Sequence, residues 1–397
     1  MNAAALRAGI IALSLLLVWR VLQVNVVLFD DDGRPRLPAA PQASTSAAAS
    51  DGELLKRVLD DNPGQVDALL LLARERERAG DLRETRHAYQ VAFELAPMDR
   101  EVLGSGSEFF LKQGETGPAL AMLDRLVESY PEAQARAFPV LAQLLAERRD
   151  PAAWNAIAAR RPAWIGPFIV SACREGANPE ILAPLFLDRV RERRAGSEEA
   201  ACLIDRLRES DRWQQAYQLW LNTLTPDRYA DVGHIFNGSF EYAASGVGFD
   251  WILSRARERD VGHSVEISQA SGPGGKRALH VSYNGKRQTG MPAMQYLALP
   301  AGRYEMTGNA RPQAIAAGRG IQWTVRCVKG GKSQAPLAAS ERFVGSSEWR
   351  RFSFEVSVPA DCPGQLLQLE PVGLSTEGFV FLAGSAWFDD LVLRRRG

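Results

Sequence analysis

The spacing of apolar residues changes twice along this chain of 397 residues. Residues 8–29 are almost continuously apolar, residues 51–227 repeat their apolar positions with a helical spacing, and strict alternation begins near residue 233. Alternation marks half-buried strands, and the helical spacing marks amphipathic helices. A chain of this length also exceeds what one core usually covers. The pattern therefore predicts a multidomain α plus all-β protein with an N-terminal transmembrane helix, an α-solenoid and a C-terminal β-sandwich.

Residues 8–29 are long enough to span a bilayer, which takes about 20 residues. Arg20 interrupts the stretch, but a long basic side chain can reach toward the interface. Arg7 precedes the stretch and three aspartates, at 30–32, follow it, which places residues 1–7 in the cytoplasm. We expect a single-pass anchor in the inner (cytoplasmic) membrane with the bulk of the chain in the periplasm or outside. A cleaved signal peptide is the alternative, and it too exports the chain.

Residues 30–50 are rich in Pro, Ala and Ser and show no apolar period, so they predict a flexible linker. Beyond it, Pro63, Pro97 and Pro131 are spaced by 34 residues, and Gly80 and Gly114 keep the same interval. This period resembles tetratricopeptide repeats over residues 51–131. The positions that fit the small and large packing sites of such repeats are Leu72, Ala73, Tyr89, Ala92, Phe110, Ala119, Leu123 and Leu126.

Two glycines, Gly104 and Gly106, fall inside an expected helix, where each costs about 1 kcal/mol against alanine. They predict a loose helix or an unusually close helix contact. Residues 132–227 continue the helical pattern without the strict period, as an irregular extension of the solenoid. Within it Trp213 and Trp220 share one helix face with Tyr217 and are interpreted as core. By analogy with repeat arrays, the solenoid is expected to bind a protein partner of the cell envelope.

Residues 233–396 predict about nine strands joined by Gly, Pro and Asn turns, the first of them in HIFNGSFEY. The ordered segments NGSFE, GFDW, GKRALHVSYN, LPAGRYEMTG, EWRRFSFEVSVP and WFDDLVL resemble the jelly-roll carbohydrate-binding modules of families four and nine and their galactose-binding-like relatives. The resemblance implies a glycan, a polysaccharide or an oligosaccharide, as ligand. It also implies a structural calcium ion held by Glu241 and Asp389, the alternative being a carboxylate pair that only makes hydrogen bonds. No cofactor is otherwise required.

Sugar recognition uses aromatic faces for stacking and planar polar groups for hydroxyls. Core packing is the alternative for each aromatic, and the parity of Trp323 with Val325 favours it there. Trp251 follows a glycine-rich loop, and Arg311 is placed in the long GNARPQAIAAGRG connection, where binding residues concentrate. The candidate glycan-binding residues are Trp251, Tyr283, Gln295, Tyr296, Arg311, Trp323 and Arg326.

The chain carries 47 basic and 47 acidic residues, which argues against nucleic-acid binding. Of its four cysteines, Cys327 and Cys362 both end strands and are expected to form a disulfide, which would persist in an exported protein. Two buried free thiols are the alternative.

The sequence contains no HExxH or CxxC spacing, and SGPGGKR is best interpreted as a hairpin turn. We therefore expect a non-enzymatic, membrane-anchored scaffold with a repeat array for protein and a module for glycan. By resemblance it belongs to exopolysaccharide assembly or export. The alternatives are an envelope interaction protein whose sandwich binds no sugar, and a carbohydrate-active enzyme with an unrecognised site.

Overall fold

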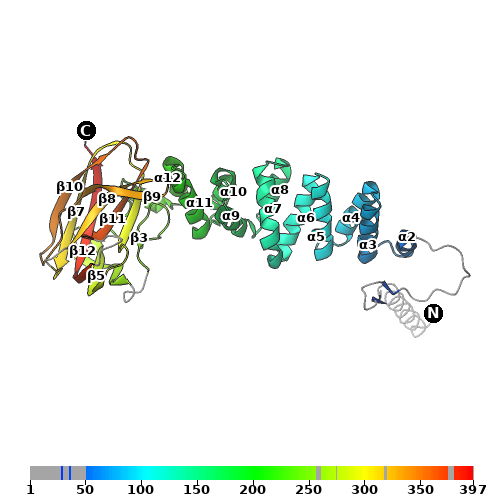
Figure 1. Ribbon diagram of the computed structural model, residues 1–397, viewed down its shortest axis with the longest axis horizontal. Coiled ribbons are helices and arrows are strands. Elements are labelled where there is room, and N and C mark those ends of the chain that lie inside the picture. The colour runs from blue at the N-terminus through cyan, green and yellow to red at the C-terminus, as the bar shows by residue number, and fades with distance from the viewer. Residues whose placement is uncertain are drawn as a thin grey trace, which may run out of the picture. The chain divides into compact units, whose positions relative to one another are not determined.

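The computed structural model describes residues 51–396 except 256–260, 274, 317–319 and 374–379, together with two short paired strands near the N-terminus, β1 Leu28–Phe29 and β2 Pro35–Arg36 (Figure 1). The expected anchor at 8–29 and linker at 30–50 lie outside the described residues except for these strands. Within the described ranges, no helix combines the length and the apolar character needed to cross a membrane.

The chain divides into two compact units at Pro162. Helices of the first unit begin at regular intervals, because α3, α5 and α7 start at residues 66, 100 and 134, each 34 residues after the last. The period therefore extends one helix pair further than the sequence indicated. The elements are α2 Asp51–Asp61, α3 Val66–Arg78, α4 Leu82–Leu95, α5 Arg100–Lys112, α6 Thr116–Ser129, η1 Pro131–Ala133, α7 Gln134–Ala146 and α8 Pro151–Arg160.

Turn chemistry explains why helices stop and start at this interval. Gly80 has a φ of +78°, a left-handed conformation that glycine adopts without strain and that ends helices. Asp81 follows it and caps α4, with its carboxylate accepting a hydrogen bond from the backbone N–H of Glu84 at 3.1 Å. Asp99 caps α5 in the same way, by accepting from the N–H of Val102.

Small residues let the helices of the first unit approach closely. Ala73, Ala92 and Ala119 are fully buried in one cluster with Tyr89. A Cβ built on Gly106 would lie 2.5 Å from the sulfur of Met122, so this glycine marks a close helix contact. By contrast, Gly104 faces open space.

The second unit begins with four helices, so the expected irregular continuation at 132–227 is divided between the units. A disulfide between Cys173 and Cys202 joins the first of these helices to the third. The elements are α9 Ile165–Arg174, α10 Pro179–Arg191, α11 Ser197–Glu209, α12 Trp213–Leu221 and the short η2 Pro226–Asp231.

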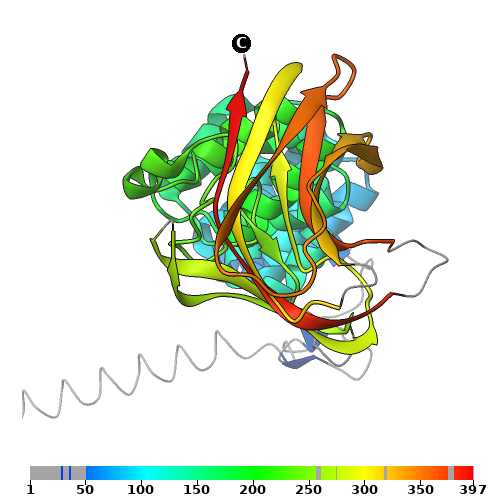
Figure 2. The ribbon, with the colours of Figure 1, turned by 90° about the vertical axis from the view of Figure 1, so that its left-hand side faces the viewer.

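Two antiparallel five-stranded sheets form the C-terminal sandwich (Figure 2). One sheet, called sheet C, has the order β10-β7-β12-β5-β4, and the other, sheet B, has the order β3-β6-β11-β8-β9. The strands are β3 Ile252–Leu253, β4 His263–Gly272, β5 Gly275–Arg287, β6 Ala293–Leu297, β7 Gly302–Gln313, β8 Ile321–Lys329, β9 Lys332–Ala339, β10 Arg350–Val358, β11 Gly364–Pro371 and β12 Phe381–Arg395.

The expected first strand, HIFNGSFEY, is wrong. Asn237 and Phe240 have φ angles of 51° and 55°, which no strand accommodates. The side chain of Asn237 instead bonds the backbone N–H and C=O of Tyr242, closing a loop. Strands β3 and β9 were not expected, because β3 is only two residues long and β9 is mostly exposed.

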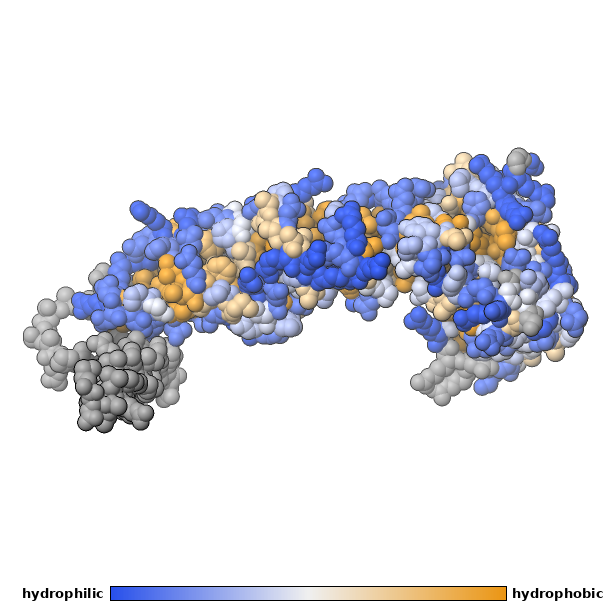
Figure 3. All heavy atoms as spheres, turned by 180° about the vertical axis from the view of Figure 1, so that it is seen from behind, coloured by the Kyte–Doolittle hydropathy of each residue, from blue (hydrophilic) through white to orange (hydrophobic). Residues whose placement is uncertain are grey.

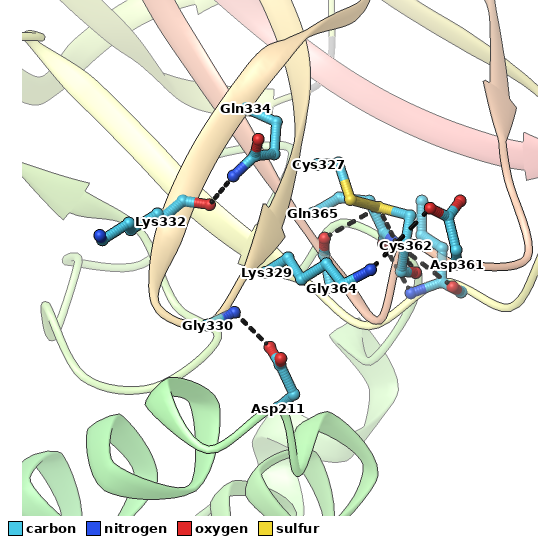
Figure 4. The surroundings of a disulfide bond; sticks show 11 residues. Asp211, Cys327, Lys329, Gly330, Lys332, Gln334, Asp361, Cys362, Gly364 and Gln365 are labelled. Carbon is cyan, nitrogen blue, oxygen red and sulfur yellow. Dashed lines mark hydrogen bonds and ion pairs between the residues drawn. A yellow bond between two sulfur atoms is a disulfide. The ribbon is translucent and has the colours of Figure 1, made fainter.

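Aromatic rings from α12 pack on one end of the sandwich. Trp220 meets Phe236 edge-on at 5.1 Å, and Trp213 lies 5.9 Å from Tyr296 between ring centroids. Beside them, the carboxylate of Asp211 accepts a hydrogen bond of 2.8 Å from the N–H of Gly330, in the β8–β9 turn (Figure 4). The Trp213–Trp220 face is a packing face, as expected, but its partner is the sandwich.

The expected bond between Cys327 and Cys362 is present. Cys327 lies near the end of β8, and Cys362 lies two residues before the start of β11 (Figure 4). The two Cα atoms are 5.6 Å apart. All four cysteines of the chain are therefore paired, one disulfide lying within the helices and one within the sandwich.

Candidate functional site

Four of the candidate glycan-binding residues point inward. Trp251, Trp323, Tyr283 and Gln295 are buried. For Trp323 this agrees with the parity of its strand, and for the other three the expected surface position is wrong. Alternation explains Tyr283 and Trp323, which share the parity of the apolar core positions on β5 and β8. None of these four side chains is available to a ligand on the surface.

Trp251 is the clearest correction. Its ring packs between those of Phe240 and Trp323, at 5.1 and 5.7 Å, and its indole N–H donates to the carbonyl of Asn237 at 3.0 Å. Gln295 likewise serves the fold, because its amide bonds both the N–H and the C=O of Phe236.

Arg326 lies on the opposite, outward side of sheet B and is part of a polar network. Its guanidinium contacts both oxygens of the Glu370 carboxylate, at 3.1 and 3.3 Å. The same carboxylate accepts hydrogen bonds from the side-chain amides of Gln368, at 2.6 Å, and Gln322, at 3.3 Å. Gln322 pairs with Glu370 across β8 and β11, so the sheet register itself assembles the network.

Two donors of this network remain without a partner among the described residues. They are the buried hydroxyl of Thr324 and the buried Nε–H of Arg326. Thr324 pairs with Gln368 in the register, so its hydroxyl lies beside the amide row. Buried polar groups normally find partners, and those that do not often mark a ligand or water site.

Tyr296 forms the border between this polar surface and the helices. The guanidinium carbon of Arg208 lies 3.7 Å from the centre of the Tyr296 ring, a cation–π contact. Arg208 also donates to the carbonyl of Gly248 at 2.9 Å, which fixes the guanidinium in place. The helical part of this unit thus contributes to the edge of the site.

Sequence reasoning missed Gln322, Gln368 and Glu370. The segment IQWTVRC does predict part of this network. Successive side chains of a strand point to opposite faces, so if Trp323 points inward, Gln322, Thr324 and Arg326 all point outward. Strand β11 gives no such signal, because every residue of QLLQLEP is buried and apolar and polar positions do not separate cleanly.

Arg311 lies within strand β7, so its expected loop position is wrong. Its guanidinium carbon is 5.3 Å from the ring centre of Trp349 and 5.4 Å from that of Trp387, on the outward side of sheet C. Sequence reasoning did not single out either tryptophan.

The two expected calcium ligands, Glu241 and Asp389, converge on the β4–β5 hairpin, which SGPGGKR forms as expected. A Cβ built on Gly275 would lie 2.2 Å from an oxygen of Glu241, and one built on Gly272 would lie 2.3 Å from an oxygen of Asp389. These glycines face each other in the register, so both carboxylates reach the same turn.

Hard carboxylate oxygens at a glycine hairpin suit calcium chemically. One oxygen of Glu241 is already used, because it accepts from the N–H groups of Lys276 and Arg277 at 2.8 and 3.0 Å. A calcium ion here would need backbone carbonyls to complete its shell. In the ranges that the structure covers, no group of three or more His, Cys, Asp or Glu residues is arranged to hold a metal.

No protein-family model matches this chain, and no curated protein matches it. The C-terminal sandwich is similar in fold to carbohydrate-binding modules of known structure. A family 4 module shares 16% identity, with a TM-score of 0.31 over 41% of this chain and 99% of that one. The family 22 xylan-binding domain of Paenibacillus barcinonensis Xyn10C shares 17%, with a TM-score of 0.28 over 40% and 91%. A family 61 module in complex with β-1,4-galactotriose shares 15%, with a TM-score of 0.28 over 42% and 99%.

Proposed function

We propose that the sandwich is a carbohydrate-binding module and that the outward side of sheet B holds the glycan. The polar network around Glu370 carries this proposal, because it presents planar amide and guanidinium groups in a fixed arrangement. Sugar hydroxyls both donate and accept hydrogen bonds, and such groups satisfy both roles. A network that is already ordered binds without a further loss of side-chain freedom.

Thr324 is fully buried on the outward side of sheet B, so its unpartnered hydroxyl tests whether a glycan, directly or through a bridging water, reaches this point. Thr324→Val keeps the shape of the side chain and removes only the hydroxyl, which makes no hydrogen bond to the described residues. We expect unchanged or slightly higher stability, and about two- to tenfold weaker binding of soluble oligosaccharides in calorimetry, the value of one neutral hydrogen bond.

Thr307→Val is the matched control, because Thr307 lies on β7 in the other sheet. It should leave oligosaccharide affinity unchanged. Equal affinities for wild type and Thr324→Val would contradict the proposal for this face, and so would the absence of binding to every oligosaccharide in a broad panel.

We further propose that Glu241 and Asp389 hold a structural calcium ion at the β4–β5 hairpin. Calcium that binds only the folded state raises the melting temperature. The gain should be abolished by Asp389→Asn and by chelator, while magnesium should have little effect. A melting temperature insensitive to calcium would leave the carboxylates as hydrogen-bonding groups only.

The whole protein, in this proposal, is a non-enzymatic scaffold in exopolysaccharide assembly or export, anchored in the inner membrane and exported. The helical repeats would hold a protein partner. Figure 3 shows apolar residues, in orange, among the polar ones along the helical part. Leu82, Leu95 and Met98 are exposed apolar residues of the first unit. A reporter fused after Ser50 should be active only outside the cytoplasm, and cytoplasmic activity would refute export.

A further inference from the structure

We propose that the outward side of sheet C carries a second carbohydrate-binding surface, which takes the face of an uncharged, insoluble polysaccharide. This surface shares no residue with the site on sheet B, and its test uses a different ligand. Five side chains define it, and it is called the aromatic ladder below: Glu266, His280, Trp387, Arg311 and Trp349.

The register of sheet C places the ladder residues side by side. Glu266 pairs with His280 across β4 and β5, His280 with Trp387 across β5 and β12, and Trp387 with Arg311 across β12 and β7. Trp349 directly precedes β10 and continues the row beyond Arg311. Neighbouring strands lie about 4.8 Å apart, so the ladder crosses the sheet over about 19 Å. That length accommodates several sugar rings.

The rings of the ladder stack on one another. His280 lies over Trp387 with centroids 4.1 Å apart and planes at 21°, and Arg311 fills the space between the two indoles. Leu279, Val281, Ala386 and Phe388 alternate with these residues and face the core, so the ladder faces away from it. Both tryptophans are only partly buried.

A row of hydroxyl and amide groups runs beside the ladder. Ser264 pairs with Ser282, Ser282 with Ser385, and Ser385 with Gln313 in the same register. The serine hydroxyls of Ser264 and Ser282 are 2.7 Å apart, and Ser385 donates to the Gln313 amide oxygen at 3.3 Å. Because His280 and Arg311 cover the two faces of Trp387, the row offers apolar ring edges next to hydroxyl groups. A pyranose ring has an apolar C–H face and a polar hydroxyl edge, so it can contact both rows at once.

The charges of the ladder balance. Arg311 contributes one positive charge and Glu266 one negative charge. Burial lowers the pKa of His280, although Glu266, whose carboxylate lies 3.8 Å from the imidazole, opposes this, so the imidazole is neutral near pH 7. A surface without net charge favours an uncharged polymer over an anionic one.

Two donors within the ladder have no partner among the described residues. They are the buried Nε–H of Arg311 and the buried indole N–H of Trp349. Both belong to side chains that contact each other, and buried donors without a partner often mark a ligand or water site. An apolar protein partner would leave both donors unsatisfied, which argues for a hydroxyl-rich ligand.

The test is retention of the whole protein on insoluble polysaccharides, with cellulose, chitin and β-1,3-glucan particles as probes. Trp387→Ala combined with Trp349→Ala should reduce retention on at least one of them by about tenfold or more. Affinity for soluble oligosaccharides, which reports on sheet B, should stay as in wild type. Phe381→Ala is the matched control, because Phe381 is 66% exposed on the same strand as Trp387 but outside the ladder.

If the double variant does not fold, Trp349→Ala is tested alone. Trp349 lies outside the strands, so its replacement is expected to disturb the sheet less. Unchanged retention of the folded variants would overturn the proposal, as would a wild-type protein that none of the three particles retains. Loss of a co-purifying protein, with retention on particles unchanged, would assign the ladder to a protein partner and overturn it as well.

Discussion

Trp213 lies directly against the backbone of Gly364, since a Cβ built on that glycine would be 2.0 Å from the indole ring. Helix α12 and strand β11 therefore meet without an intervening side chain. We expect Gly364→Ala to destabilise the second unit by about 1–3 kcal/mol, the usual cost of overpacking. Gly233→Ala is the control, because its Cβ would make only a 3.4 Å contact. Equal melting temperatures for both variants would show that the ring moves aside without cost.

The two glycines of α5 should respond differently to the same change. Gly104→Ala meets nothing within 4 Å and should stabilise the helix by about 0.5–1 kcal/mol. Gly106→Ala meets Met122 at 2.5 Å, so this gain should be reduced or lost. Chemical denaturation of both variants checks the prediction, and an identical gain at the two positions would contradict it.

Trp251→Ala should remove a buried side chain and not a ligand contact. We expect a loss of about 3–5 kcal/mol, typical of a large aromatic in a core, with a lower melting temperature. Trp323 and Phe240 would line the resulting cavity. A variant that keeps wild-type stability but loses glycan binding would return Trp251 to the surface.

The Cys327–Cys362 disulfide closes a loop of 35 residues. Replacing both cysteines with alanine should cost about 3–4 kcal/mol by the chain-entropy estimate. The Cys173→Ala/Cys202→Ala pair, with a separation of 29 residues, should cost a similar amount and serves as the comparison. Peptide mapping without reductant checks the pairing first, and cysteines that alkylate freely in folded protein would refute it.

Stability should fall in mild acid partly through His280. Burial lowers the pKa of His280 in the folded protein, while the unfolded value is about 6.5. Above pH 6.5 the imidazole is neutral in both the folded and the unfolded protein, and the full contribution of the neutral His280 to the free energy of unfolding is present. As the pH falls below that value the unfolded chain binds the proton first, and this contribution is progressively lost down to the folded pKa. His280→Gln should therefore show a shallower loss of stability between pH 7 and 5, and parallel curves would contradict this.

The division into helices and sandwich followed from periodicity, because repeat spacing and alternation both reflect which face of an element is buried. The same logic placed Trp323 in the core and Trp213 and Trp220 in a packing face. It could not say that the face of α12 packs on the sandwich, because a buried stripe carries no information about its partner.

The candidate site was harder to predict, because a ligand-binding face is built from residues of several neighbouring strands. The sequence of one strand does not show how it aligns with its neighbours. Arg326 was singled out alone, but Glu370 and Gln368 join it only through the β8–β11 pairing. Trp251 was misplaced because its loop folds over it, with Asp250 accepting from the N–H of Ser245 at 2.8 Å. Nothing in the local spacing indicates this closure.

The packing of α12 against the sandwich also determines where the chain can be divided to produce a stable recombinant fragment. A fragment that begins at Gly233 would strip Trp220 and Tyr217 from Phe236 and Phe249, leaving aromatic rings open to water and prone to aggregate. A cut after Pro162 keeps these rings together, along with both disulfides. The smallest well-behaved fragment that contains the sandwich is thus expected to include four helices, which the sequence pattern of the sandwich alone would not indicate.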